Sequence, residues 1–303
     1  MPELPEVESI KLQLERFLVG LPRGGSLRGH KIENIEIRNK RYEIGDKEKL
    51  SGAKITGVRR FAKVLSIDLS DNKSILIHVK LTGQLIYRGP NLPRQTLLSK
   101  KVVGGIPGKH THVVFHLDKG GVLYYNDIRQ FGWVKLVDSQ KLMSDGFVGK
   151  LGPEPQVVKG YKGQEFLTPK HFGEILAKTK RAVKVVLMDQ ERMGGVGNIY
   201  ANDALWLAGI DPRRAANSLQ HGEIEKLYNS LLSVLKAGLK YGGASELAFV
   251  TPDGNEGKYQ EHTLVYGHQG QFCKNPACRQ AGAIIKKTFK SGRGTYFCPL
   301  CQK

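Results

Sequence analysis

The four cysteines of this 303-residue chain all lie in its last 31 residues, spaced Cys273-x4-Cys278-x19-Cys298-x2-Cys301. Two close pairs separated by a hairpin-sized gap are typical of a tetrahedral four-thiolate zinc site whose intervening segment folds back as a β-ribbon. Such a small element has too little core to fold by itself, so we expect one structural Zn²⁺ to supply its folding free energy. Two disulfides or four unligated thiols are the alternatives. However, nothing in the sequence suggests export, and thiols without a shared role do not cluster in this way.

The predicted metal-binding segment is strongly basic. Residues 262–303 contain seven lysines and arginines and no aspartate or glutamate. The whole chain has a formal net charge of +19 and a pI near 9.7. A protein this basic suggests a polyanionic partner, and nucleic acid is the usual one. General solvation by lysine is the alternative, because charge alone carries little specificity.

Length and composition set further bounds. A chain of this length predicts two or three domains. No apolar run is long enough to span a membrane, and three glutamates among the first eight residues are unlike a signal peptide. Cysteines confined to a metal site fit a reducing compartment. We therefore expect a cytoplasmic protein with no membrane segment.

Hydrophobic periodicity separates a β-rich first part from a helical second part. Residues 4–18 have the spacing of an amphipathic helix, with Glu8, Lys11 and Glu15 on its polar face. Runs of strand-forming residues follow at 64–69, 74–79, 112–117 and 122–125, and Asp118-Lys-Gly-Gly121 joins the last two as a hairpin turn. This part, up to about residue 138, is predicted to be a β-sandwich or barrel.

A glycine- and proline-bearing stretch at 149–163 predicts a linker before the helical part. Thr168 is a candidate N-cap because Pro169 follows it at a first helical position. Further helices are expected at 181–191, 198–208 and 221–240, and Gly242-Gly243 ends the last of them. A polar loop at 244–260 follows, and we expect the ribbon to begin near Leu264.

Gly194-Gly-Val-Gly-Asn198 lies directly before one of these helices. Glycines let the backbone approach a phosphate closely, and a helix N-terminus offers unpaired N–H groups to it. Asn198 is a candidate both for capping the helix and for donating its amide to the phosphate. An ordinary capped helix start is the alternative.

The chain begins Met1-Pro2-Glu3-Leu4-Pro5. Methionine before proline is readily removed, which exposes Pro2 as a free secondary amine with a pKa near ~8. The neutral amine is a nucleophile that can attack a sugar C1′ and form a cationic iminium, which in turn favours strand cleavage by elimination. Glu3 is placed to protonate the sugar ring oxygen or to move protons. By composition alone, Pro2 and Glu3 are simply good residues for a first helical turn.

These motifs, taken in order, resemble the bacterial formamidopyrimidine-DNA glycosylases, which excise 8-oxoguanine and ring-opened purines. The N-terminal Met-Pro-Glu-Leu-Pro-Glu-Val-Glu is similar to the start of that family. Further similarities occur along the whole chain, at Phe61-Ala-Lys63, Arg129-Gln-Phe-Gly132, Leu151-Gly-Pro-Glu-Pro155, Leu187-Met-Asp189, Gly195-Val-Gly-Asn-Ile-Tyr-Ala201, Val265-Tyr-Gly267 and Arg293-Gly-Thr-Tyr-Phe-Cys298.

The resemblance implies an α+β protein made of consecutive parts. These are an N-terminal helix with a catalytic β-sandwich (1–138), a linker (139–163), a helical helix–two-turn–helix domain with a lesion-covering loop (164–261), and a zinc finger (262–303). It implies a bifunctional DNA glycosylase and AP lyase of base excision repair that acts through β,δ-elimination. The implied partner is double-stranded DNA containing oxidised purines or abasic sites. We expect a monomer located at the bacterial nucleoid.

The resemblance also assigns roles to single residues. Pro2 is the implied nucleophile and Glu3 the acid, while Lys63 is implied in β-elimination and Arg293, at the finger tip, in phosphate binding and δ-elimination. Taken without the family, Lys63 is a strand-end lysine and Arg293 one more basic residue of a basic ribbon. The residues that match the family's DNA contacts are His110, Arg129, Lys180, Lys184 and Asn198.

Reaching a base inside a duplex requires extruding it and filling the gap. Leu81, Arg129 and Phe131 match the family's three wedge residues, as a plug, a partner for the orphaned base and a stacking ring. Otherwise, Leu81 and Phe131 are ordinary strand-end hydrophobic residues.

The chain departs from the family pattern in several places. Many members have methionine at the position of Leu81, proline at that of Ile128 and arginine at that of Gln130, and these changes bear on the wedge and on opposite-base preference. The x4 gap after Cys273 is longer than the usual x2. Residues 91–109 form a longer basic loop than the family pattern predicts.

Two other functions stay open at this point. One is a pyrimidine-lesion glycosylase of the endonuclease VIII branch, which usually begins Pro-Glu-Gly-Pro-Glu; Leu4 and the 244–260 loop argue against it. The other is a catalytically silent binder of damaged DNA, which a retained Met1 would produce by blocking the amine.

Overall fold

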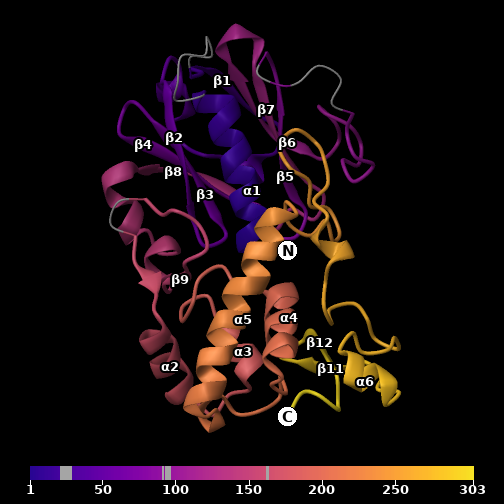
Figure 1. The fold of residues 1–303 in the computed structure, drawn as a ribbon. Helices are drawn as coiled ribbons and strands as arrows, with labels where there is room; N and C mark the ends of the chain where they lie inside the picture. The colour runs from indigo at the N-terminus through magenta and orange to yellow at the C-terminus, as the bar shows by residue number, and fades with distance from the viewer. Residues whose placement is uncertain (21–28, 91, 93–96, 162–163) are drawn as a thin grey trace. The chain divides into compact units, whose positions relative to one another are not determined.

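The computed structural model describes residues 1–20, 29–90, 92, 97–161 and 164–303. The chain forms two compact units, each of which combines segments distant in sequence (Figure 1). The first unit contains residues 1–150 and 241–260, and the second contains residues 151–240 and 261–303. Residues 241–260, which the sequence grouped with the helical part, therefore pack with the N-terminal half.

The first unit is a sandwich of two antiparallel four-stranded sheets. One sheet has the order β1-β6-β7-β5, formed by Ile32–Ile37, Thr111–Leu117, Val122–Asp127 and Gly83–Arg88. The other has the order β2-β3-β4-β8, formed by Ile55–Phe61, Val64–Leu69, Lys73–His78 and Trp133–Asp138. The predicted turn at 118–121 is confirmed as the β6–β7 connection, with Lys119 and Gly120 at positive φ.

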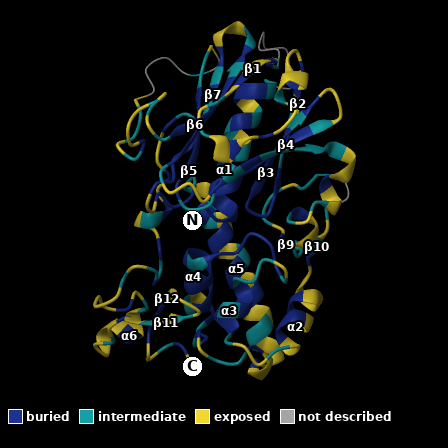
Figure 2. Ribbon diagram, turned by 180° about the vertical axis from the view of Figure 1, so that it is seen from behind, coloured by how far each residue is buried: buried dark blue, intermediate teal, exposed yellow. Residues whose placement is uncertain are grey.

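Helix α1 (Leu4–Leu14) packs its apolar face into the sandwich core, where Val7, Ile10 and Leu14 are fully buried. It is shorter than the predicted 4–18 helix because a π-helical turn, Glu15–Val19, follows it. The expected polar face also differs: Glu8 is buried, because its carboxylate accepts a hydrogen bond from Arg60 Nε of β2 at 2.7 Å. Two buried charges require such pairing. Figure 2 shows buried residues along α1 and the strands around it.

The second unit is helical. Helix α4 (Asn198–Ala208) packs against α5 (His221–Lys240) and α3 (Val183–Leu187), and α2 (Pro169–Ala177) packs against α5. A short parallel pair, β9 (Glu154–Pro155) with β10 (Phe166–Leu167), precedes the helices. The bounds of α4 and α5 agree with prediction, and Thr168 caps α2 by accepting a hydrogen bond from His171 N at 3.2 Å. The helix expected at 181–191 is confined to the five residues of α3.

The C-terminal segment of this unit is tied to α4. Asp203 of α4 accepts hydrogen bonds from the backbone N–H groups of Leu264, Val265 and Tyr266, each at 3.0 Å. Turns and the short helix α6 (Pro276–Gln280) follow. The antiparallel ribbon of β11 (Lys286–Lys290) and β12 (Arg293–Phe297) thus starts later than the predicted Leu264.

Among the residues that the structure describes, no helix has the length and the apolar composition needed to cross a membrane.

Candidate functional site

The N-terminal residues are fixed by a buried carboxylate. Glu3 is the N-cap residue of α1, and its backbone N–H donates to Glu6 Oε2 at 2.7 Å. The other oxygen of Glu6 accepts from Ala244 N, also at 2.7 Å. Pro2, Glu3 and Glu6 are all buried. One carboxylate therefore joins the start of the chain to residues 241–260.

Lys63 lies in the tight turn between β2 and β3, after Ala62 at φ +51°. Arg60, which pairs with Glu8 of α1, also donates from Nη1 to the Ala62 carbonyl at 2.9 Å. This chain of bonds links α1, which carries Pro2 and Glu3 at its start, to the turn that carries Lys63. Lys63 is itself buried, unlike the solvated strand-end lysine that composition alone would suggest.

Lys63 and Lys80 both lie close enough to His78 to act on its charge. Burial, together with the nearby Lys80 and Lys63, lowers the pKa of His78 to about 3. The ring of His78 packs edge-on against Trp133 and Phe147, and its Nδ1 accepts from Lys80 N at 3.1 Å. The histidine is therefore neutral at physiological pH and adds no charge beside these lysines.

The three predicted wedge residues are organised by one buried carboxylate, that of Asp127 at the end of β7. It accepts hydrogen bonds from Thr82 Oγ1 at 2.5 Å and from Gly132 N at 2.7 Å. Thr82, which directly follows Leu81, also accepts from Arg129 N at 3.0 Å. The loop of Leu81 and the loop of residues 128–132, here called the wedge loop, are thus held together.

The exposed part of this arrangement is aromatic and cationic. Phe131 is 49% exposed, and the guanidinium carbon of Arg129 lies 4.6 Å from the centre of its ring. Leu81 is half-buried. An exposed ring beside a cation matches the properties of a residue that stacks on a base.

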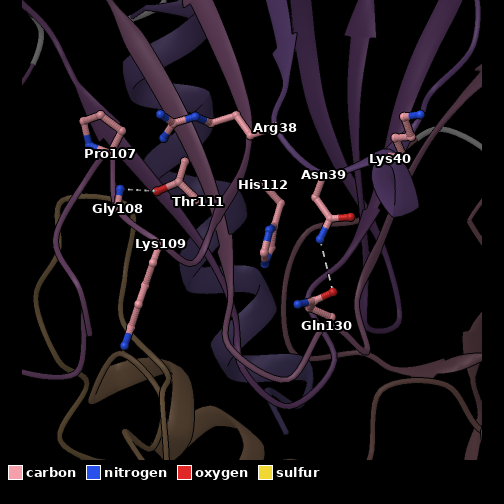
Figure 3. Close-up of a pocket in the computed structure, with 9 residues that line it drawn as sticks. All are labelled: Arg38, Asn39, Lys40, Pro107, Gly108, Lys109, Thr111, His112 and Gln130. Carbon is pink, nitrogen blue, oxygen red and sulfur yellow. Dashed lines mark hydrogen bonds between the residues drawn. The ribbon is translucent and has the colours of Figure 1, made fainter.

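A cleft of about 780 Å³ lies beside the wedge loop (Figure 3). It is lined by residues 38–40, 107–109, 111, 112 and Gln130, none of which is acidic. Asn39 Nδ2 donates to Gln130 Oε1 at 3.1 Å and so connects the end of β1 to the wedge loop. Arg38 pairs with Glu36 outside the cleft at 3.0 Å, whereas Lys109, next to half-buried His110, is exposed. The cleft is suited to a negatively charged ligand.

In the second unit, the side chain of Gln190 holds the glycine-rich segment that precedes α4. Gly195, at φ +90°, donates its N–H to Gln190 Oε1 at 3.0 Å. Asn198 is the first helical residue, and the N-cap position is taken by Gly197. The expected capping by Asn198 is therefore wrong. Its side-chain oxygen accepts instead from Asn202 Nδ2, at 3.3 Å.

The two lysines predicted to contact DNA in this unit differ in exposure. Lys180 is exposed just before α3. Lys184 is only 1% exposed, and its Nζ donates to the Gly294 carbonyl at 2.6 Å and to Thr295 Oγ1 at 2.8 Å. It therefore supports β12 from the protein interior, whereas Arg293 at the start of that strand is exposed.

The four cysteines converge as predicted. Their sulfur atoms all lie within 4.8 Å of one another, and Cys273 Sγ and Cys301 Sγ are 3.9 Å apart. Four thiolates at about 2.3 Å from a tetrahedral zinc ion would be about 3.8 Å apart, so the group fits such an ion. The longer first gap is accommodated by α6, which Asn275 caps by accepting from Cys278 N at 3.2 Å.

Sequence reasoning missed Glu6 and Asp127. Both lie within the motifs that carried the resemblance or next to them, but their roles depend on partners distant in the chain. The signal that identifies them is burial of an acidic side chain beside a motif, and the sequence alone does not show burial.

Comparison with known proteins gives consistent results. Residues 1–134 match the model of the formamidopyrimidine-DNA glycosylase N-terminal domain, and residues 151–249 match that of the formamidopyrimidine-DNA glycosylase H2TH domain. The chain is 35% identical to a formamidopyrimidine-DNA glycosylase of Heliobacterium modesticaldum, with all of both chains covered. It is similar to the crystal structure of Lactococcus lactis Fpg with abasic-site DNA, at 32% identity, a TM-score of 0.79 and 99% of each chain covered. Another similar structure is the Lactococcus protein bound to DNA containing an oxidised pyrimidine, at 32% identity, a TM-score of 0.79 and full coverage of both chains.

Proposed function

The chain belongs to the formamidopyrimidine-DNA glycosylase family, and from this premise we propose that it excises oxidised purines from double-stranded DNA and cleaves the strand at the resulting abasic site. The observation that carries the proposal is the N-terminal Pro2-Glu3 pair, held by Glu6 at the start of a buried helix.

The reaction uses Pro2 as the nucleophile once Met1 has been removed. The amine nitrogen attacks C1′, the bond from C1′ to the base nitrogen breaks, and the base leaves with a proton. Glu3 protonates the ring oxygen, so that the sugar opens and a cationic iminium joins Pro2 to C1′. The iminium acidifies C2′–H, and loss of that proton breaks the C3′–O bond. A second elimination breaks the C5′–O bond, and water then hydrolyses the iminium.

Cationic residues bind the strand during these steps. We assign to Lys63 phosphate binding and proton transfer in the first elimination, because it is a buried lysine close to His78 and is linked through Arg60 to the helix that begins after Pro2 and Glu3. Arg293 and Asn198 are assigned to the phosphates next to the lesion, with Arg293 acting in the second elimination. His110 and Lys180 are further backbone contacts. For Lys184, burial favours support of the ribbon over direct contact.

Extrusion of the base is assigned to Leu81, Arg129 and Phe131. Leu81 fills the vacated space, Arg129 bonds the orphaned base and Phe131 wedges beside it. The acid-free cleft next to Gln130 supports backbone binding in the same region. The segment 244–260 is assigned to cover the extruded base, because its first residues contact Glu6 beside Pro2 and Glu3.

Cys273, Cys278, Cys298 and Cys301 are assigned to one zinc ion, which would supply folding free energy to the ribbon and no chemistry to the reaction. We further assign the protein to the bacterial cytoplasm at the nucleoid, because that is where its substrate is, and expect it to act as a monomer.

Borohydride trapping on an 8-oxoguanine duplex tests the proposal. Protein whose intact mass shows loss of Met1 is expected to form a covalent adduct, and N-terminally acetylated protein is not. Pro2→Gly keeps a terminal amine, now primary, and is expected to be much slower. An acetylated or Pro2→Gly protein that nicks the duplex as fast as the native protein would refute the chemistry.

One observation keeps a second lesion class in the test. A similar Lactococcus protein has been crystallised with DNA that contains an oxidised pyrimidine. Excision should therefore be compared on 8-oxoguanine and thymine glycol duplexes. We expect faster excision of the purine. Faster excision of the pyrimidine would instead indicate a glycosylase specific for pyrimidine lesions. A protein that retains Met1 and binds both duplexes without cleavage is instead a silent binder.

A further inference from the structure

The loop that exceeds the family pattern lies against the segment proposed to cover the base. Its described part, residue 92 and residues 97–109, runs beside residues 244–256 in the first unit (Figure 1). Val102 of the loop and Val250 of the segment are buried together against Ile86 of β5, with Leu98 and Ile106 packed alongside. The two segments therefore share a small apolar core of their own.

A buried side chain of β5 bridges the two segments. Gln84 is 2% exposed, and its Nε2 donates to the Lys101 carbonyl at 2.9 Å and to the Ala248 carbonyl at 2.7 Å. A single amide nitrogen thus satisfies one backbone carbonyl from each segment. Moving either segment would leave a buried polar group unpaired, which is costly.

Lys101 adds a second bridge from the loop side. Its Nζ donates to the Ser245 carbonyl and pairs with Glu256 Oε2 at 2.7 Å. Ser99 Oγ donates to the other oxygen of Glu256 at 2.5 Å. Both ends of the 245–256 segment are therefore held by residues 99–101. Because the Lys101 and Glu256 side chains are partly exposed, a substitution here disturbs geometry more than it disturbs folding.

The bonds at Ser245 and Ala248 lie on either side of Leu247. This leucine is 64% exposed and has a φ of +51°, in the left-handed region that side-chain-bearing residues rarely adopt. Such strain persists only where the surrounding structure imposes it, and it concentrates at functional positions. Ala244, three residues earlier, is the residue bonded to Glu6 beside Pro2 and Glu3.

We propose that Gln84 and Lys101 are positioning residues that hold residues 245–248 in the conformation that presents Leu247 to the extruded base. The 97–102 loop then governs how fast the damaged base is removed. This inference rests on the proposed glycosylase function. It concerns base removal alone, because an abasic site has no base for Leu247 to contact.

The test compares two reactions of the full-length protein. Lys101→Met is expected to slow single-turnover excision of 8-oxoguanine roughly ten-fold through misplacement of the segment. Strand cleavage at a preformed abasic site should stay within about two-fold of the native rate, because the iminium chemistry is untouched. Lys100→Met is the matched control, since Lys100 is the exposed neighbour with the same charge. It should change neither rate.

A second variant separates positioning from general stability. Leu247→Ser removes the apolar contact but keeps the backbone strain, and it should slow excision while sparing abasic cleavage. In the double variant with Lys101→Met, the two losses should not add, because both act through Leu247. Equal loss in both reactions, no loss in either, or additive losses would overturn the inference. Failure of the proposed function itself would show differently, as native protein that cleaves no abasic DNA.

Discussion

Replacing Asp127 by alanine is expected to destabilise the first unit and release the wedge loop. The carboxylate is fully buried and accepts two short hydrogen bonds, from Thr82 Oγ1 at 2.5 Å and from Gly132 N at 2.7 Å. Two longer bonds come from the hydroxyls of Tyr42, at 3.2 Å, and Tyr125, at 3.5 Å. Because hydrogen bonds to a charged group contribute about 1.5–3 kcal/mol each, loss of the two short bonds alone should lower the free energy of unfolding by about 3–6 kcal/mol.

Urea unfolding followed by tryptophan fluorescence measures this change, since Trp133 directly follows the wedge loop. Asp127→Asn keeps an acceptor for one of the short bonds, so about half of the loss is expected. Asp71→Asn is the control: Asp71 is exposed in the β3–β4 turn, and its replacement should change stability by less than about 0.5 kcal/mol.

The same variant should alter function in a specific way. With the loop released, Arg129 and Phe131 no longer enter the duplex in a fixed position, and excision should lose its discrimination among opposite bases. An Asp127→Ala protein that loses less than about 1 kcal/mol and keeps its opposite-base preference would refute the view that this carboxylate organises the wedge.

Three further predictions concern other parts of the chain. Because the folded protein holds the pKa of His78 at about 3 against an ordinary 6.5, the unfolded chain alone takes up this proton as pH falls below 6.5. The free energy of unfolding should therefore drop by about 2 kcal/mol between pH 7 and pH 5 from this group, and His78→Gln should remove that part in pH-dependent urea titrations. Cys278→Ser should lower the metal content below one ion per chain by mass spectrometry and weaken DNA binding, and full metal retention would contradict the four-thiolate site. Lys184→Met should weaken DNA binding, because the Gly294 carbonyl next to Arg293 loses its hydrogen-bond donor. In affinity measurements, its effect and that of Arg293→Ala should therefore not be additive.

Some elements of this fold were predictable because their signals are local. The bounds of α5 follow from apolar residues repeated every three or four positions and from the glycines that end the helix, whereas α4 is buried on nearly all sides and begins after a glycine-rich segment. The hairpin turn at 118–121 follows from its Asp-Lys-Gly-Gly sequence, in which Gly120 adopts a positive φ at no steric cost. The cysteine group follows from spacing alone, and Pro2-Glu3 from the motif at the chain start. In each case, the residues whose pattern gives the prediction are themselves the residues of the predicted element.

Other features were decided by contacts between distant residues. Glu6 and Ala244 are 238 positions apart, and their bond joins residues 241–260 to the N-terminal half. Glu8 is buried despite its place on a polar helix face because Arg60 meets it from β2, and Lys184 turns inward because β12 offers it a carbonyl. A buried charge requires a partner, and the sequence does not reveal which distant group the folded chain will bring to it. The sequence by itself therefore determined the family and the cysteine group, and it predicted the nucleophilic amine. Only the tertiary structure decided which carboxylates and lysines position them, because pairing across the chain leaves no periodic pattern.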